Sequence, residues 1–202
     1  DGTLIDYKVV EKNVPAGYEA KYEKDGTGKF IITNTNVEKT EVSVTKKWVG
    51  PVKDSIIVEL RKVGSNDVIQ EYELKASDNW THKFTNLPKY ENDGTEIEYQ
   101  VVEKSVASGY ISAIEGTMQD GFTITNTNVE KVEVSVTKKW VGPAKDSVIV
   151  ELKKAGSDTV IQEHELKANE NWSYEFTGLD KYEVDGTLID YKVVEKNVPA
   201  GY

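Results

Sequence analysis

Residues 42–50 read VSVTKKWVG, and the same nine residues recur at 134–142. In the first copy Val42, Val44 and Trp48 fall on one face of an extended chain, with polar residues between them. A two-residue period of this kind predicts a half-buried β-strand rather than a helix. Lys46 shares the apolar face, so the segment that indicates the strand also carries an unusual charge.

The recurring segment belongs to a repeat of 92 residues. Residues 37–110 match residues 129–202 at 52 of 74 positions without gaps, and residues 1–18 are identical to residues 185–202. The TITNTN segment at 123–128 returns as IITNTN at 31–36. We therefore expect the C-terminal part of one repeat at 1–36, a complete repeat at 37–128, and the N-terminal part of the next at 129–202.

The complete repeat alternates short apolar–polar segments with turns rich in Gly, Asn and Asp, and none of it has the period of a long amphipathic helix. Seven strands in about 92 residues predict an all-β fold of tandem seven-stranded β-sandwiches. The expected strands span residues 41–48, 56–63, 68–74, 80–85, 96–103, 110–115 and 121–126.

Composition narrows the range of functions. The net charge of -10 argues against a nucleic-acid partner, because phosphate binding needs concentrated Lys and Arg. The absence of cysteine excludes disulfides and thiolate chemistry, and no apolar run is long enough for membrane insertion of this segment. No catalytic triad, metal-ligand or phosphate-loop pattern occurs, so we expect no cofactor, no metal and no enzyme. His82 and His164 occupy different repeat positions, which predicts tolerant surface sites rather than a repeated role.

Three strands direct a polar residue toward the core. Parity places Lys46 with the valines of the first strand, Glu103 with Ile97 and Val101, and Asn126 with the apolar side chains of the last strand. Each has an ordinary explanation: a Lys that extends to the rim, a carboxylate at a strand end, an amide in a turn. Together they favour a buried ion pair or a reactive triad. The repeat places the same residue types at Lys138 with Glu195, and at Glu11 with Asn34.

Such a triad has a definite chemistry. Desolvation lowers the pKa of Lys and raises that of Glu until a proton can pass between them. The neutral Lys46 amine is then a nucleophile, and Glu103 can shuttle protons to ammonia leaving Asn126. The product is a Lys–Asn amide, formed once in an autocatalytic reaction rather than by an enzyme that turns over.

The chain resembles the collagen-adhesin B-type (Cna B-type) domain of Gram-positive surface adhesins and pili. The resemblance rests on VSVTKKWVG, on NWTHKFTNLPKY at 79–90, on EIEYQVVEKSVASGY at 96–110 and on TITNTN. It implies a reverse immunoglobulin-like sandwich with an isopeptide bond between Lys46 and Asn126, assisted by Glu103. Some members use an Asp from another strand, which leaves the acid open. Parity disfavours Lys47 but does not separate Asn126 from Asn128.

The favoured function is a stalk module of a cell-wall anchored surface adhesin of a Gram-positive bacterium, stiffened by this bond and projecting an adhesive tip. Its expected partners are adjacent repeats and, through other domains, the host extracellular matrix. A host-matrix binding repeat and a polymerising pilin-type subunit are the alternatives. The incomplete ends have two interpretations. Head-to-tail strand complementation between chains is one, because residues 129–202 carry Lys138 and Glu195 but lack a last strand, which residues 19–36 supply with Asn34. The other is that the sequence is a window of a longer array whose neighbouring repeats complete both ends.

Overall fold

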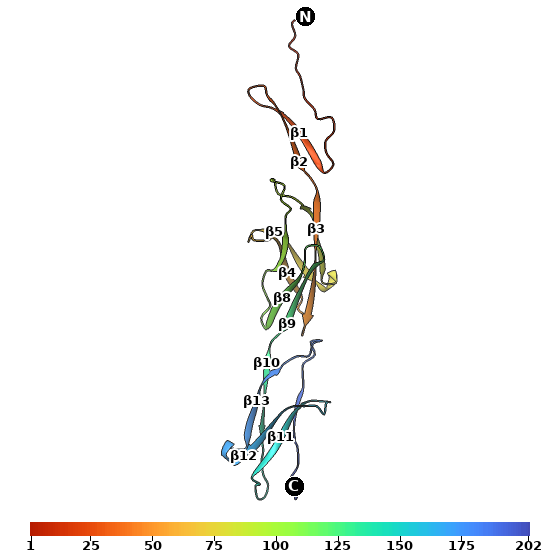
Figure 1. Ribbon diagram of the computed structural model, residues 1–202. Helices are drawn as coiled ribbons and strands as arrows, with labels where there is room; N and C mark the ends of the chain where they lie inside the picture. The colour runs from red at the N-terminus through yellow and green to blue at the C-terminus, as the bar shows by residue number, and fades with distance from the viewer. The chain divides into compact units, whose positions relative to one another are not determined.

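The computed structural model describes all residues from 1 to 202, and its regular elements are β-strands with two short 3₁₀ turns (Figure 1). The strands up to the end of the complete repeat are β1 (Tyr18–Lys24), β2 (Phe30–Asn36), β3 (Lys39–Val49), β4 (Ser55–Lys62), β5 (Val68–Lys75), β6 (Thr81–Pro88), β7 (Tyr99–Glu103), β8 (Tyr110–Thr117) and β9 (Gly121–Asn128). Those that follow are β10 (Lys131–Thr137), β11 (Ser147–Lys154), β12 (Val160–Lys167), β13 (Ser173–Asp180) and β14 (Tyr191–Glu195). No helix is long and apolar enough to cross a membrane.

Backbone contacts divide the chain into two compact units. The first unit comprises Asp1–Lys46, Ser55–Lys104 and Ile114–Ile124, and the second comprises Lys47–Asp54, Ser105–Ala113 and Thr125–Tyr202. Each unit is built of antiparallel strands, as short connections between consecutive strands require.

The seven strands β3 to β9 form two sheets, with the orders β6-β3-β9-β8 and β5-β4-β7. β3 pairs antiparallel with β6, opposing Val42 to Phe84. β4 is the central strand of the second sheet, opposing Leu60 to Gln70 on β5 and to Val101 on β7. The all-β fold of tandem sandwiches that the sequence predicts is therefore confirmed.

The core of these strands consists of the side chains that parity directs inward. All are less than a tenth exposed: Val42, Val44, Ile56, Val58, Leu60, Leu74, Phe84, Leu87, Ile97, Tyr99, Val101, Tyr110 and Ile124. Burial of this apolar surface is the main favourable term in folding. The Tyr99 hydroxyl satisfies its own burial by donating a hydrogen bond of 2.7 Å to the Pro88 carbonyl.

The last five strands repeat this plan in part, with sheets β10-β13 and β12-β11-β14. Their core centres on Leu152, Leu166 and Phe176, all fully buried. β10 pairs only with β13, whereas its counterpart β3 lies between β6 and β9, and Val134 is accordingly half-buried where Val42 is fully buried. At the other end of the chain, β1 and β2 form a hairpin (Figure 1).

Two strands begin later than the sequence predicts. β6 starts at Thr81 because Asn79 and Trp80 adopt left-handed conformations, with φ of 50° and 58°, which an extended strand excludes. β7 starts at Tyr99 because the Ile97 amide donates to the Lys89 carbonyl instead of to a neighbouring strand. Neither change alters which side chains face the core.

Candidate functional site

Lys46 lies in the core near the end of β3 and is 3% exposed. Burial of its ammonium lowers the pKa of Lys46 to about 8, and the negative charge of Glu103 opposes part of this shift. Lys47 points the other way and is exposed. The alternation that favours Lys46 over Lys47 therefore agrees with the observed burial.

A strained turn holds the backbone of Lys46. Its amide donates a 2.8 Å hydrogen bond to the carbonyl of Trp80, the second of two consecutive left-handed residues. Such a conformation in a bulky residue costs about 1–3 kcal/mol and persists only where the surrounding structure enforces it. The same arrangement recurs between Lys138 and Trp172, whose φ is 57°. The sequence pattern does not predict this use of the Trp80 and Trp172 carbonyl groups.

Glu103 is the last residue of β7 and is 7% exposed. It opposes Val58 on β4, so its side chain shares the inward face with Val101. Its charge acts on Lys46. The structure thus brings the predicted nucleophile and the predicted acid into one buried region, contributed by both sheets of the sandwich.

Asn126 lies on β9, the neighbour of β3 in the four-stranded sheet, and is fully buried. It follows the buried Ile124 on the same strand face. Asn128 differs, because its side chain accepts a hydrogen bond from the Glu130 amide at 3.1 Å and donates one to the Glu130 carboxylate at 3.3 Å. Asn128 therefore orders the connection to β10, which separates two asparagines that parity alone cannot distinguish.

The second copy of the site holds its two members in direct contact. Lys138 Nζ and Glu195 Oε2 are 2.8 Å apart, with the two side chains 19% and 17% exposed. The ammonium also lies 4.5 Å from the centroid of the Trp140 ring, a favourable cation–π distance. The other carboxylate oxygen of Glu195, Oε1, is buried and makes no hydrogen bond.

The N-terminal copy is not assembled in the same way. Asn34 is exposed on β2, where it opposes Ala20. Glu11 precedes β1 and lies outside any strand, although its backbone amide donates to the Tyr22 hydroxyl at 3.1 Å. Residues 1–36 contain no counterpart of Lys46, which in the complete repeat lies on the first strand.

Sequence reasoning missed a second group of buried charge. Glu59 is 3% exposed although alternation along β4 directs it away from Val58 and Leu60. It is covered by Arg61, whose Nε donates to Glu59 Oε2 at 3.0 Å. No group of three or more His, Asp and Glu side chains is arranged to hold a metal ion. Glu59 and Arg61 form an ion pair instead.

Comparison with known proteins supplies the family. The model of the Cna protein B-type domain matches residues 42–127 and 134–202. The collagen adhesin of Staphylococcus aureus is 28% identical over 215 aligned residues, which include 98% of this chain but only 17% of the adhesin. This chain therefore spans a small part of the length of that relative.

Two solved structures from Staphylococcus aureus are also similar. The crystal structure of two B repeat units of the collagen binding protein is 29% identical, covers 100% of this chain and 55% of that one, and has a TM-score of 0.46. A single B repeat unit is 28% identical over 82% of this chain and 89% of that one, with a TM-score of 0.40. Because the family model matches well over half of the 202 residues, the chain belongs to the Cna protein B-type domain family, and its two matched segments are homologous to the B repeats of the staphylococcal collagen adhesin.

Proposed function

We propose that residues 37–128 form a stalk module of a bacterial surface adhesin, stiffened by a self-made amide bond between Lys46 and Asn126. The observation that carries the proposal is the burial of Lys46 beside Glu103, with a pKa lowered to about 8. A neutral amine is far easier to obtain at such a site than in water, where Lys has a pKa near about 10.4. Asn126 on the adjacent strand is buried as well.

The reaction balances without any cofactor. Lys46 Nζ attacks Cγ of Asn126, the Cγ–Nδ2 bond breaks, and the nitrogen leaves as ammonia. Glu103 takes a proton from the attacking nitrogen and delivers it to the departing one, so the carboxyl group ends in its starting state. Each domain reacts once. The buried surroundings favour the step because desolvation disfavours the charged form of Lys46.

The bond would join the first and last strands of the sandwich, β3 and β9. Only two residues separate β9 from β10, and only two separate β2 from β3. Pulling force that enters at β3 would therefore pass through the crosslink to β9 and on to the next repeat. By analogy with disulfides, closing a loop of this size stabilises the fold by about 4–5 kcal/mol. Resistance to unfolding under load gains more, since extension then requires breaking a covalent bond.

The surface role follows from the family. One relative is named for collagen adhesion, and its B repeats are the part that this chain resembles. A crosslinked, rigid module suits a position between a cell wall and an adhesive domain. We place the chain outside a Gram-positive cell, anchored through the wall, with host contacts made by other domains of the protein.

Intact-mass spectrometry of the folded chain tests the reaction directly. Formation of the bond removes one ammonia, and tandem mass spectrometry should place the crosslink between Lys46 and Asn126. Lys46→Met, Asn126→Ala and Glu103→Gln should each retain the full sequence mass while remaining folded, and each should unfold at a lower temperature. A wild-type chain that keeps its full mass would overturn the crosslink.

Matched control variants test the assignment of Lys46 and Asn126 as the crosslinked residues. Lys47→Met and Asn128→Ala change the neighbouring residues of the same types, which are exposed and engaged with Glu130 respectively. Both variants should still lose ammonia. Retention of the full mass in Lys47→Met would show that Lys47 is the crosslinked lysine. The same result in Asn128→Ala would show that Asn128 is the crosslinked asparagine. Ammonia loss in Glu103→Gln would assign the proton transfer to another acid.

A further inference from the structure

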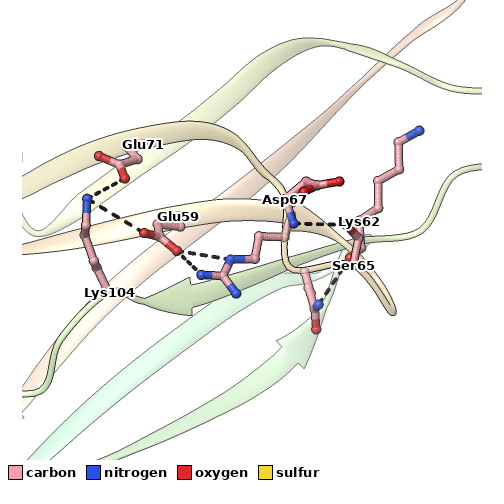
Figure 2. A network of polar contacts seen from close by, with 8 residues as sticks. Glu59, Lys62, Ser65, Asp67, Glu71 and Lys104 are labelled. Atoms are coloured by element: carbon pink, nitrogen blue, oxygen red, sulfur yellow. Dashed lines mark hydrogen bonds and ion pairs between the residues drawn. The ribbon is translucent and has the colours of Figure 1, made fainter.

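The outer face of the sheet β5-β4-β7 carries a buried carboxylate bound by two cations. Glu59 on β4 accepts from Arg61 and lies 3.9 Å from Lys104 Nζ, which donates at 2.6 Å to Glu71 on β5 (Figure 2). Lys104 thus reaches from the end of β7 across the central strand. We call Glu59, Arg61, Glu71 and Lys104 the outer cluster. It connects all three strands of this sheet.

The outer cluster lies directly behind the proposed acid. Lys104 follows Glu103, and successive side chains along a strand point to opposite faces, so one reaches the outer cluster while the other faces Lys46. β7 is an edge strand whose regular pairing ends at Glu103. Strand ends are where pairing is weakest, yet an acid that transfers protons needs a fixed position. The Lys104 amide, which donates to the Ile57 carbonyl at 2.9 Å, provides one restraint.

The buried Glu59 makes the outer cluster more than a surface ion pair. Exposed ion pairs contribute little to stability, and Lys104 with Glu71 alone would belong to that class. Glu59 is different because a carboxylate that is 3% exposed needs cations around it. Lys104 therefore cannot swing into solvent without weakening the compensation of a buried charge. The hydrogen bond to Glu71 also raises the pKa of Lys104, so the cation persists at neutral pH.

The second copy repeats the arrangement. Glu151 lies 2.8 Å from Lys153 and 3.6 Å from Lys196, which pairs with Glu163 at 2.5 Å. On the opposite face, Glu195 contacts Lys138 at 2.8 Å. β10 has no neighbour there corresponding to β9. The outer ion pairs and the inner Lys–Glu contact thus occur on the two faces of the same strand end in this copy as well.

We propose that the outer cluster, through Lys104, positions Glu103 against Lys46 for the crosslinking step. This inference rests on the proposed amide bond and adds to it a residue that touches neither reacting atom. Lys104 is a positioning residue: it fixes the end of β7 from the solvent side. Its loss lets Glu103 move away from Lys46 while the sandwich stays folded.

The rate of crosslinking provides the first test. The full chain is made by cell-free synthesis, translation is stopped, and ammonia loss is followed by intact mass over time. We expect Lys104→Met to slow the loss about threefold or more, because displaced reacting groups lose the benefit of fixed geometry. Lys104→Arg should restore the rate. The matched control is Lys83→Met, which removes a 2.6 Å pair with Glu41 on the other sheet, at similar exposure; it should react like the wild type.

A second readout separates positioning from simple stability. In an Asn126→Ala background no crosslink forms, and the pKa of Lys46 can be measured by NMR. Removing the positive charge of Lys104 by itself would raise that pKa slightly, whereas losing Glu103 from its place would lower it further below about 8. We expect the lower value for Lys104→Met and no change for Lys83→Met.

The two proposals fail separately. A wild-type chain without ammonia loss overturns the crosslink itself. A wild-type chain that reacts, with Lys104→Met reacting equally fast or showing a raised Lys46 pKa, overturns the positioning role and leaves the crosslink standing.

Discussion

The His82 imidazole stacks on the ring of Tyr72, with centroids 3.5 Å apart and planes 9° from parallel. The corresponding residues of the next repeat, Tyr174 and His164, stack at the same 3.5 Å with the two residue types exchanged. Each pair joins an edge strand of one sheet to an edge strand of the other. Both histidines are half-buried, and the exchange of residue types preserves one His–Tyr contact in each copy of the repeat.

The stack makes a pH dependence predictable. Burial lowers the pKa of His82 below its ordinary value, although the charge of Asp78 opposes the shift. In an unfolded chain the imidazole takes up a proton near about pH 6.5. The contribution of His82 to stability is therefore complete above that pH and declines as the pH falls through it toward the lower pKa of the folded state.

NMR titration of the two histidine rings measures this pKa, with His164→Gln assigning the signals. We expect the His82 signal to titrate below pH 6.5. A His82 pKa at or above that value would contradict the burial argument. In a His82→Phe chain, the loss of stability between pH 7.5 and pH 5 should be smaller than in the wild type.

A double-mutant cycle measures the stack itself. We expect Tyr72→Ala and His82→Ala each to destabilise residues 37–128, with a coupling energy of about 0.5–1.5 kcal/mol between them. The free energy of unfolding is measured in urea on the full chain, with NMR signals of residues 37–128 as the probe. Additive effects would show that the parallel rings contribute only burial. The exchanged double variant Tyr72→His with His82→Tyr reproduces the second repeat and should retain most of the coupling.

Burial of Lys46 predicts a second pH dependence of stability, this time at alkaline pH. In the uncrosslinked Asn126→Ala chain the folded pKa of Lys46 is about 8, below the unfolded value near about 10.4. The folded state then binds fewer protons between these values, so stability rises as the pH increases through that window. The same variant with Lys46→Met should lack this rise. The measurement is the free energy of unfolding in urea at pH 7.5 and at pH 9.5 for both variants. An equal change between the two pH values in both variants would show that Lys46 is not desolvated before it reacts.

Sequence patterning found the inward charges but not the outer ones, for a physical reason. Alternation along a single strand decides which face a residue occupies, and that was enough for Lys46, Glu103 and Asn126. The same alternation along β4 directs Glu59 to the outer face, opposite to Val58 and Leu60. Its burial there comes from Arg61 on its own strand and from Lys104 and Glu71 on two other strands. Which residues oppose each other depends on strand order and register, which one sequence does not contain.

The left-handed turn at Asn79 and Trp80 escaped prediction for a related reason. Asn tolerates positive φ, but Trp disfavours it, so local preference indicates a strand start at residue 80. Tertiary structure overrides that preference by placing the Trp80 carbonyl on the Lys46 amide. The sequences DNW at 78–80 and ENW at 170–172 contain no local signal that predicts this hydrogen bond.

The two ends of the chain lead to a further proposal about its partners. We propose that residues 129–202 accept a hairpin like β1–β2, supplied by the continuing repeat in a longer array or, between copies of this 202-residue chain, by a neighbouring molecule. β10 lacks the neighbour that β3 has in β9, and its valines are only half-buried. The hairpin corresponds in sequence to β8 and β9, and its Asn34 is exposed. Strand addition would cover the open face and satisfy the unpaired edge.

Covalent capture would follow from the same chemistry as in the complete repeat. Lys138 and Glu195 are already 2.8 Å apart, and the buried Oε1 of Glu195 has no hydrogen-bond partner. Asn34 of the incoming hairpin supplies the missing amide. Because donor and acceptor surfaces differ, the association is head-to-tail and continues as an open filament. Residues 1–18 and 185–202 are identical, so one copy must give way where the hairpin docks.

Denaturing gels across a concentration series test this filament. We expect a ladder of covalent oligomers whose yield grows with protein concentration, joined through Lys138 and Asn34. Lys138→Met and Asn34→Ala should each abolish the ladder. Lys46→Met should leave the ladder intact, because it removes only the proposed bond within residues 37–128. A single monomer band at every concentration would reject covalent joining, and a ladder that survives Lys138→Met would place the bond elsewhere. Mixing the Lys138→Met and Asn34→Ala chains should give dimers but no longer ladder, since one chain then supplies only the amide and the other only the amine.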